Sequence, residues 1–511
     1  MVVGRIKKGA YYDSVTLMTV ARELALLEGV DDAAVVMGTP ENRAILEASS
    51  MLAPEFETAG GNDLLIAVSA KSADVATRAL AAADEVLDGV GRRGDEGPAR
   101  VPKSLGSALE VVPDANLALI SVAGRYAGGL AREALERGLH VMLFSDNVPL
   151  ATEVQLKARA HERGLLVMGP DCGTAIVNGV PLGFANAVRR GPIGIVAASG
   201  TGLQEVSSII TNRGAGVSQA VGTGGRDVSA EVGGVTFLDA LAALGEDDDT
   251  RVIVLISKPP DAEVSARIRS LASRVGKPVV TVFLGEKPRD RHGARTLAGA
   301  AFKAVAALED GRPDRDAGPV DTLEGATNEL AEELASASAP GRRYVRALMS
   351  GGTFASEAQV VFEDLGLGGV YSNVPLGRAV PLDDPLVSRA NTVVDMGSDE
   401  FTVGRPHPMI DYSLRVKRIR EEAADPDVAV ILLDVVLGYG SHADPASELA
   451  PVIRDAAERV AVVCSVTGTD RDPQGRRAVY MALAEAGAHI ARTNAEACAV
   501  AGRIGQILEG A

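Results

Sequence analysis

The 511-residue sequence contains no tryptophan, and aromatic residues make up only 3% of it. Its three cysteines, Cys172, Cys464 and Cys498, are too far apart for a disulfide framework or a metal-binding set. No pattern of histidines and acidic residues indicates a metal site either. Because cysteine is sparse, we expect a reducing, cytoplasmic location and no structural metal.

Positively charged residues are also few: the sequence has 51 Lys and Arg residues against 68 Asp and Glu residues, which gives a formal net charge of −17. Such a surface repels nucleic acids and anionic lipids, so neither is an expected partner. Apolar runs stay below the roughly 18 residues of a membrane span, and the opening MVVGRIKKGAYYDS lacks the apolar segment of a signal peptide. An anionic ligand would have to be held by local dipoles.

Glycine is abundant, with 56 residues, and short apolar runs alternate with segments of helical periodicity. This alternation is typical of parallel βαβ units, so the predicted fold class is α/β. Two charged, Gly- and Pro-rich linkers and one break between a turn and a strand divide the chain. The expected domains are residues 1–92, 108–190, 191–310 and 342–511.

The last two domains follow one plan. The stretch IVAASGTGLQEV is echoed by RALMSGGTFASEAQVV, with Ser199 and Ser350 standing 151 residues apart. AVGTGGRDVS is echoed by VVDMGSDEFT, and DDTRVIVLISKPP by DPDVAVILLDVVLG, in the same order. Matching features in one order predict a domain duplication, because the period is far longer than that of a solenoid repeat.

Each duplicated domain carries a glycine turn between a strand and a helix. The first N–H groups of a helix lack intrahelical partners and carry partial positive charge, so a glycine entry lets an anion approach them. Such turns often only tighten packing, and neither contains the lysine of a nucleotide P-loop. Two matching turns across a pseudo-two-fold axis favour one shared phosphate. The predicted phosphate-binding residues are Ser199, Gly200, Thr201, Gly202, Ser350, Gly351, Gly352 and Thr353.

The motifs VMGPDCGTAI, GIVAASGTGLQEV, AVGTGGRD and KPVVTVFLG resemble the α subunit of succinyl-CoA synthetase, and DMGSDEF and DPDVAVILLDVVLG resemble its β subunit. The stretches GPDCGTA, GVPLGFAN and TVGRPHPMID resemble the FdrA family more narrowly, a fusion of these parts. The resemblance implies a small N-terminal α/β domain, a Rossmann-like CoA-binding-type domain and two flavodoxin-like CoA-ligase-type domains. It also implies that two helix N-termini face a transferred phosphoryl group.

The sequence differs from the synthetase at the residues and domains that carry out the synthetase reaction. Leu297 stands where the phosphorylated histidine would be, and Lys258 lies near the place of a supporting glutamate. The ATP-grasp domain and the first Rossmann turn that cradles CoA are missing. These departures argue against a phosphohistidine shuttle and nucleotide use on this chain, and they make CoA a doubtful ligand.

The FdrA resemblance implies a subunit of a carbamoyltransferase of ureide breakdown, in which oxalurate and phosphate give oxamate and carbamoyl phosphate. It further implies a partner subunit and a functional link to carbamate kinase, with phosphate and carbamoyl phosphate as substrates and no certain cofactor. The alternative is an acyl-CoA synthetase or CoA-binding protein of the same superfamily.

The loop TVGRPHPMIDY offers catalytic candidates. His407 lies between two prolines that stiffen the loop, so it could donate a proton to a leaving amide nitrogen. Arg405 could fork onto a carboxylate or a phosphate. The alternative is a rigid surface loop with an ordinary salt bridge.

Further candidates for substrate binding follow other strands of the expected sheets. Arg226 is either an anion clamp or the partner of Asp227, and Cys172 is a nucleophile, a substrate contact or a small buried hydrophobe. VTGTDRDPQ follows a strand and is expected to line the cleft at the strand ends. The candidate substrate-binding residues are Arg226, Asp171, Cys172, Thr467 and Thr469.

Overall fold

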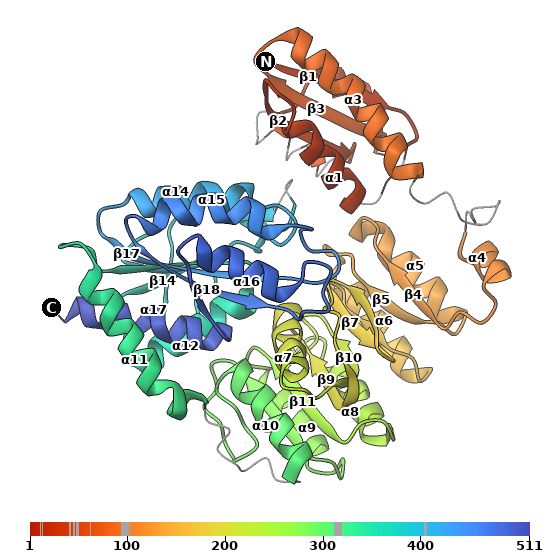
Figure 1. Ribbon diagram of the computed structural model, residues 1–511. Helices are drawn as coiled ribbons and strands as arrows, with labels where there is room; N and C mark the ends of the chain where they lie inside the picture. Colours follow the sequence, from red (N-terminus) through yellow and green to blue (C-terminus); the bar gives the residue numbers. More distant parts are fainter. Residues whose placement is uncertain are drawn as a thin grey trace. The chain divides into compact units, whose positions relative to one another are not determined.

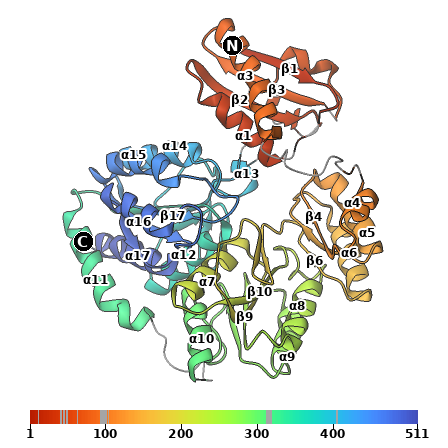
Figure 2. The ribbon, with the colours of Figure 1, turned by 45° about the vertical axis from the view of Figure 1, so that its right-hand side comes forward.

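The computed structural model divides into two compact units, residues 1–115 with 399–407 and residues 116–398 with 408–511. Figures 1 and 2 show the helices and strands of each unit from two directions. Among the residues that the structure describes, every helix is too short or too polar to cross a lipid bilayer. The description covers the chain except residues 11, 13, 40–41, 44–45, 48–50, 62, 93–101, 103, 311–318, 403–405 and 511.

The first unit is built on an antiparallel sheet in the order β1-β3-β2. The central strand β3 reads LLIAVSA and is almost wholly buried, because both faces of the sheet are covered. One face packs against α1 and α3, and the other against Phe56 of the short helix η1. The elements are β1 (Val2–Lys7), α1 (Ser14–Ala25), β2 (Val30–Met37), η1 (Pro54–Thr58), β3 (Leu64–Ala70), α3 (Ala73–Arg92), α4 (Leu105–Val111) and α13 (Asp399–Thr402).

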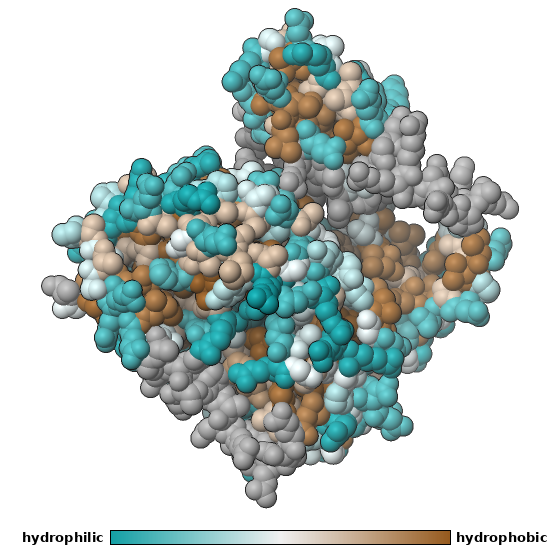
Figure 3. Space-filling model, in the orientation of Figure 1, coloured by the Kyte–Doolittle hydropathy of each residue, from teal (hydrophilic) through white to brown (hydrophobic). Residues whose placement is uncertain are grey.

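The second unit begins with a three-stranded parallel sheet in the order β4-β5-β6. The edge strand β4 exposes 48% of Leu119, and Tyr126 of α5 is 49% exposed. Hydrophobic residues accordingly reach the surface over α5 and β4 (Figure 3). The elements are β4 (Leu117–Ile120), α5 (Gly124–Glu136), β5 (His140–Leu143), α6 (Leu150–Glu162) and β6 (Val167–Met168).

The next sheet has six strands in the order β12-β11-β9-β10-β7-β8. The β7–β8 hairpin extends it antiparallel to β10, so residues from Thr174 onward join this sheet and not the preceding one. β11 reads VIVLIS and is fully buried, as expected of a strand covered on both faces. The elements are β7 (Thr174–Val177), β8 (Val180–Gly183), β9 (Arg190–Ala197), α7 (Gly200–Asn212), β10 (Val217–Gly222), α8 (Val235–Glu246), β11 (Val252–Ser257), α9 (Ala262–Ala272), β12 (Val279–Phe283) and α10 (Leu297–Asp310).

The last sheet has seven parallel strands in the order β15-β14-β16-β13-β17-β18-β19. Its central strand β17 is buried along its whole length. The elements are α11 (Pro319–Ala337), β13 (Tyr344–Met349), α12 (Gly352–Leu365), β14 (Val370–Ser372), β15 (Val380–Pro381), β16 (Asn391–Asp395), α14 (Ser413–Ala424), β17 (Val428–Val436), α15 (Pro445–Ala457), β18 (Ala461–Thr467), α16 (Arg476–Glu485), β19 (His489–Ala491) and α17 (Asn494–Glu509).

The two larger sheets share a strand order, because β12-β11-β9-β10 corresponds to β18-β17-β13-β16. Their equivalent helices α7 and α12 pack against each other, and one buried cluster joins Leu203 and Val206 of α7 to Phe354 and Ala358 of α12. The predicted α/β class, with a Rossmann-like block and two flavodoxin-like blocks after a small N-terminal domain, is confirmed. The duplication therefore brings the two glycine turns to one interface.

Candidate phosphate site at two helix starts

The first glycine turn connects β9 to α7. Ser199 is the N-cap, with an extended backbone, and its Oγ accepts a hydrogen bond from Gly202 N at 3.0 Å. This bond satisfies one of the N–H donors that a helix start leaves without a partner. A Cβ built on Gly200 would meet only Thr174 Oγ1, at 3.4 Å, which is ordinary van der Waals contact. Close packing therefore does not by itself require glycine at position 200.

The second glycine turn connects β13 to α12. Its N-cap is Gly351, which has no capping side chain. Ser350, one residue earlier, is fixed by Asp434 of β17, whose carboxylate accepts hydrogen bonds from Ser350 N at 2.7 Å and from the Ser350 hydroxyl. Arg415 lies 3.6 Å from Asp434 Oδ1 and donates to the Asp434 carbonyl oxygen. These side chains are buried, so the turn rests on a fixed polar support.

The two turns touch across the domain interface. Thr353 Oγ1 lies 2.5 Å from Ser199 Oγ, the N-cap of the other helix. A Cβ built on Gly351 would lie 2.6 Å from Thr201 Cγ2, so Thr201 fills the space beside the other N-cap. Each helix thus places its second residue against the N-cap of its counterpart. We call residues 199–202 and 350–353 the paired helix starts.

This reciprocal contact corrects the pairing read from the sequence. The helices begin at Gly200 and Gly352, so equivalent positions are 152 residues apart, not the 151 that separate Ser199 from Ser350. The N-cap Ser199 therefore corresponds to Gly351, and Thr201 corresponds to Thr353. The extra residue before α12 is Ser350, which bonds Asp434 instead of capping its helix.

Lys258 brings a positive charge to the paired helix starts. A Cβ built on Gly352, the first residue of α12, would lie 3.1 Å from Lys258 Nζ and 2.7 Å from Asp395 Oδ2. Lys258 directly follows β11 and Asp395 ends β16, so both come from the carboxyl ends of parallel strands. The helix dipole disfavours a cation at this position, and the Asp395 carboxylate lies beside it as a negative charge. In the sequence, Lys258 is notable only for its place near a lost glutamate, and its position directly after a buried strand is the signal that indicates a place at the site.

The GPDCG loop packs against the glycine loop that follows β10. A Cβ on Gly222 would lie 2.7 Å from Cys172 Sγ, and Cys172 Sγ donates to Gly222 O at 3.3 Å. Burial raises the pKa of the Cys172 thiol to about 12, so it stays protonated at neutral pH. The small-hydrophobe interpretation of Cys172 fits this environment. Asp171 is exposed, and its N–H donates to Ser145 O.

Arg226 is engaged with the preceding block. Its Nε lies 2.9 Å from Glu153 Oε2, and its Nη2 donates to Val148 O at 2.8 Å. Glu153 also accepts from the buried Lys157, which donates in turn to Asp227 at 2.8 Å. Arg226 and Asp227 thus both belong to one network that joins α6 to the loop after β10. Binding a substrate through Arg226 would require it to leave Glu153.

Thr467 and Thr469 lie buried where the two flavodoxin-like blocks meet. The Thr467 hydroxyl donates to Glu205 of α7 at 2.5 Å, and the Thr469 hydroxyl donates to Ala187 O at 2.8 Å. Asp472 of the same loop accepts from Ala187 N at 2.6 Å and from Asn186 Nδ2 at 3.0 Å. In this structure both hydroxyls serve the interface between blocks, so substrate contact through them stays a prediction.

The chain passes from the first compact unit to the second within the proline-flanked loop, between His407 and Pro408. His407 belongs to the first compact unit, and Arg405 lies outside the described residues. Their catalytic roles therefore stay predictions. Leu297, at the place of the family's phosphohistidine, is a buried residue at the first position of α10.

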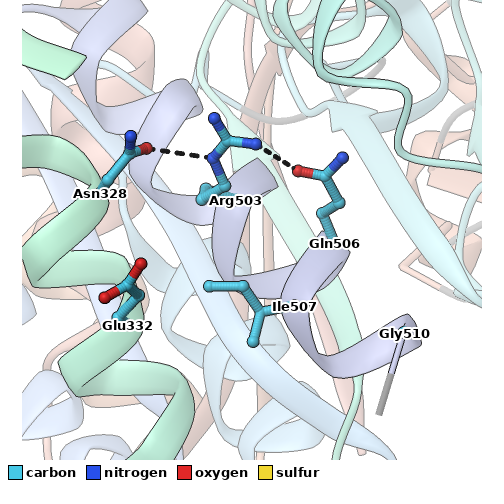
Figure 4. Close-up of a pocket in the computed structure, with 6 residues that line it drawn as sticks. All are labelled: Asn328, Glu332, Arg503, Gln506, Ile507 and Gly510. Carbon is cyan, nitrogen blue, oxygen red and sulfur yellow. Dashed lines mark hydrogen bonds between the residues drawn. The ribbon is translucent and has the colours of Figure 1, made fainter. Parts of the chain in front are cut away.

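A surface pocket of about 520 Å³ lies between α11 and α17, away from these turns. Arg503 lines the pocket and donates to Asn328 and Gln506 (Figure 4). The lining residues include Gly510 near the carboxyl end of α17, whereas Asn494 at the other end of that helix lies near α7 and α12. Among the described residues, no group of three or more His, Cys, Asp or Glu side chains could hold a metal.

Comparison with known proteins agrees with this architecture. The chain matches the family models described as CoA-ligase over residues 348–504, as succinyl-CoA ligase like flavodoxin domain over 190–323, and as AllF, heavy metal-associated domain over 1–102. The last of these stretches contains no cysteine.

Among curated relatives, the uncharacterized protein YahF of Escherichia coli K12 is 42% identical over 96% of both chains. An α subunit of succinate–CoA ligase from Archaeoglobus fulgidus is 27% identical over 39% of this chain and 70% of its own. A solved acetyl-coenzyme A synthetase of Ca. Korarchaeum cryptofilum is 18% identical and covers 76% of this chain and 82% of its own, with a TM-score of 0.28.

The duplicated sheets, the paired helix starts and the domain matches define a succinyl-CoA synthetase-like protein of the acyl-CoA synthetase superfamily. Within this superfamily the chain belongs to the FdrA family, as the full-length similarity to YahF and the AllF-type N-terminal domain show.

Proposed function

We propose that this chain is a subunit of a phosphorolytic carbamoyltransferase that converts oxalurate and phosphate into oxamate and carbamoyl phosphate. The observation that carries the proposal is the meeting of two helix N-termini beside the Lys258 ammonium group. Helix N–H groups and a lysine are suited to a phosphate dianion, which the global charge of −17 would otherwise repel.

The proposed reaction needs no nucleotide. A phosphate oxygen attacks the ureido carbonyl carbon, the bond from that carbon to the oxamate nitrogen breaks, and the nitrogen takes up one proton. Negative charge grows on the carbonyl oxygen during the attack, and fixed N–H donors stabilise such charge without reorganising. Thr201 and Thr353 add hydroxyl donors at the same place.

The other roles are part of the proposal: those of His407 and Arg405 come from the residues of the proline-flanked loop, and the partner subunit and the kinase come from the resemblance. His407 protonates the leaving nitrogen, and Arg405 pairs with the oxalurate carboxylate. A partner subunit completes the active site, and carbamate kinase consumes the carbamoyl phosphate. CoA is not required for this reaction.

The test is to incubate purified protein with oxalurate and phosphate, alone and with proteins that co-purify with it, and to measure carbamoyl phosphate. We expect phosphate-dependent formation of carbamoyl phosphate and an equal amount of oxamate. Calorimetric titration with CoA provides the second arm. Tight CoA binding without carbamoyl phosphate formation would support the acyl-CoA synthetase alternative and overturn the proposal.

A further inference from the structure

Two buried glutamates occupy equivalent places in α7 and α12. Glu205 is the sixth residue of α7 and Glu357 is the sixth residue of α12, so each lies little more than one helical turn beyond the paired helix starts. Glu357 is fully buried, and Glu205 is 3% exposed. Buried carboxyl groups are rare unless they have partners, so the duplication has placed two costly groups at one interface.

Each glutamate caps a helix of the other domain. Glu357 Oε1 accepts from Leu297 N at 2.7 Å, the first residue of α10. Glu205 Oε1 accepts from Asn494 N at 2.9 Å, the first residue of α17. Because α10 closes the first flavodoxin-like block and α17 closes the second, the two caps cross the interface in opposite directions. The two hydrogen bonds therefore fix the orientation of α7 and of α12 relative to a helix of the opposite block.

Asn494 also links the two carboxyl groups. Its backbone N–H binds Glu205, and its side-chain Nδ2 lies 2.7 Å from Glu357 Oε2. Its Oδ1 is buried without a hydrogen-bond partner. A side-chain amide can donate to an ionised carboxyl group through its nitrogen or accept from a protonated one through its oxygen. Asn494 thus joins both carboxyl groups in one buried network.

The surroundings favour the neutral form of one carboxyl group. The pKa of Glu357 is raised to about 7, chiefly by burial and also by the neighbouring Glu205, against its hydrogen bonds with Asn494 and Leu297, which lower it. Burial also raises the pKa of Glu205, against its bonds to Thr467 and Asn494. The other titratable or charged groups that act on the pair are Arg476 of α16, Asp434 of β17 and Cys498 of α17.

We propose that Glu205 and Glu357 are positioning residues that hold one proton between them and fix the paired helix starts through their crossed caps. Loss of the proton places two negative charges at the interface and loosens the contact between α7 and α12. The effect on phosphate rests on the proposed function, whereas the effect on domain packing does not.

The first experiment measures thermal unfolding of the full chain between pH 5 and pH 8 for wild type and Glu357→Gln. Because the folded pKa of Glu357 lies above its ordinary value of 4.5, its stabilising contribution is complete below that value and is lost as the pH rises through about 7. Glutamine mimics the protonated form of Glu357. We therefore expect the unfolding temperature of the variant to increase steadily, relative to that of wild type, as the pH rises.

Glu421→Gln, which removes an exposed carboxylate on α14, is the matched control and should give a constant difference from wild type. Glu205→Gln should also weaken the dependence of thermal stability on pH, because it removes the second charge of the pair. If the difference in unfolding temperature between wild type and Glu357→Gln stays the same from pH 5 to pH 8, the proposal of a shared proton is wrong. If Glu357→Gln does not fold, the infrared carboxylic acid band of wild type gives the answer, since it should persist at pH 6 and fade above pH 8.

The second experiment measures KM for phosphate in the carbamoyl phosphate assay at pH 6 and compares wild type with Glu357→Ala and Glu357→Gln. Glu357→Ala leaves Leu297 N without its acceptor and should raise KM about tenfold with a smaller change in kcat, while Glu357→Gln restores the wild-type KM. Equal values for the Ala and Gln variants would overturn the positioning role. A protein that makes no carbamoyl phosphate would refute the proposed function alone, because the unfolding curves need no substrate.

Discussion

Thr353 Oγ1 lies 2.5 Å from Ser199 Oγ, so the second residue of one helix touches the N-cap of the other. This contact joins two domains whose turns are more than 150 residues apart in sequence. A hydroxyl pair at this point can reorient toward an incoming anion, because hydroxyl hydrogens rotate to suit their acceptor. On the proposed function, both hydroxyl groups could donate to the phosphate.

The space beside Gly351 gives a first prediction. Gly351→Ala would place a Cβ 2.6 Å from Thr201 Cγ2 and force the helices apart, which should cost about 1–3 kcal/mol of unfolding free energy. Gly200→Ala meets only ordinary contact and is the control. Chemical denaturation of both variants measures the difference. Equal stability of the two would show that the helix starts are not in close contact.

Lys258 supplies the second prediction. Lys258→Ala should weaken phosphate binding by about 1 kcal/mol, roughly fivefold, because it removes the cation at the first turn of α12. The control is Arg190→Ala, which removes a positive charge paired with Asp249 at the amino end of β9, the strand end opposite the turn. Phosphate titrations at low and moderate salt provide the measurement. An equal loss of phosphate affinity in both variants would show that Lys258 acts only through the net charge of the protein.

Cys172 gives a prediction about pH. Burial raises its thiol pKa to about 12, so the reactive thiolate stays scarce between pH 7 and pH 9. Alkylation of the native protein should therefore be slow over this range and become fast only after unfolding. Cys172→Ala should keep most of its turnover. Rapid modification of Cys172 at pH 7, accompanied by loss of activity, would restore the nucleophile interpretation.

The proline-flanked loop gives the fourth prediction. His407→Ala should lower kcat more than it raises KM, because a general acid acts in the transition state. Arg405→Ala should mainly raise KM for oxalurate through the lost carboxylate contact. His161→Ala, which removes an exposed histidine paired with Asp239, is the control. Full turnover of both loop variants would return the loop to a structural role.

Much of the fold could be predicted from the sequence because the strands carry strong local signals. The apolar runs at β9, β11, β13 and β17 are continuous, and the echoed glycine turns indicated the duplication. The β7–β8 hairpin was harder, since short strands do not reveal which sheet they join.

The polar support of the site could not be predicted in the same way. Glu205 and Glu357 lie in ordinary helical stretches, and Asn494 that joins them is 289 residues from Glu205 in sequence. Arg226 pairs by tertiary contact with Glu153, and its sequence neighbour Asp227 pairs with Lys157. Sequence periodicity indicates which side chains are buried, but the partner of a buried polar group depends on the packing of distant elements.

Calorimetric titration with inorganic phosphate tests whether the paired helix starts bind a phosphate ion. Wild type, alone or with proteins that co-purify with it, should bind one phosphate per chain, and the double variant Gly200→Ala/Gly351→Ala should lose this binding because methyl groups block the approach to the helix N–H groups. Carbamoyl phosphate should compete for the same site. Absence of phosphate binding by the wild-type protein, or unchanged binding by a folded double variant, would contradict a phosphate site at the paired helix starts.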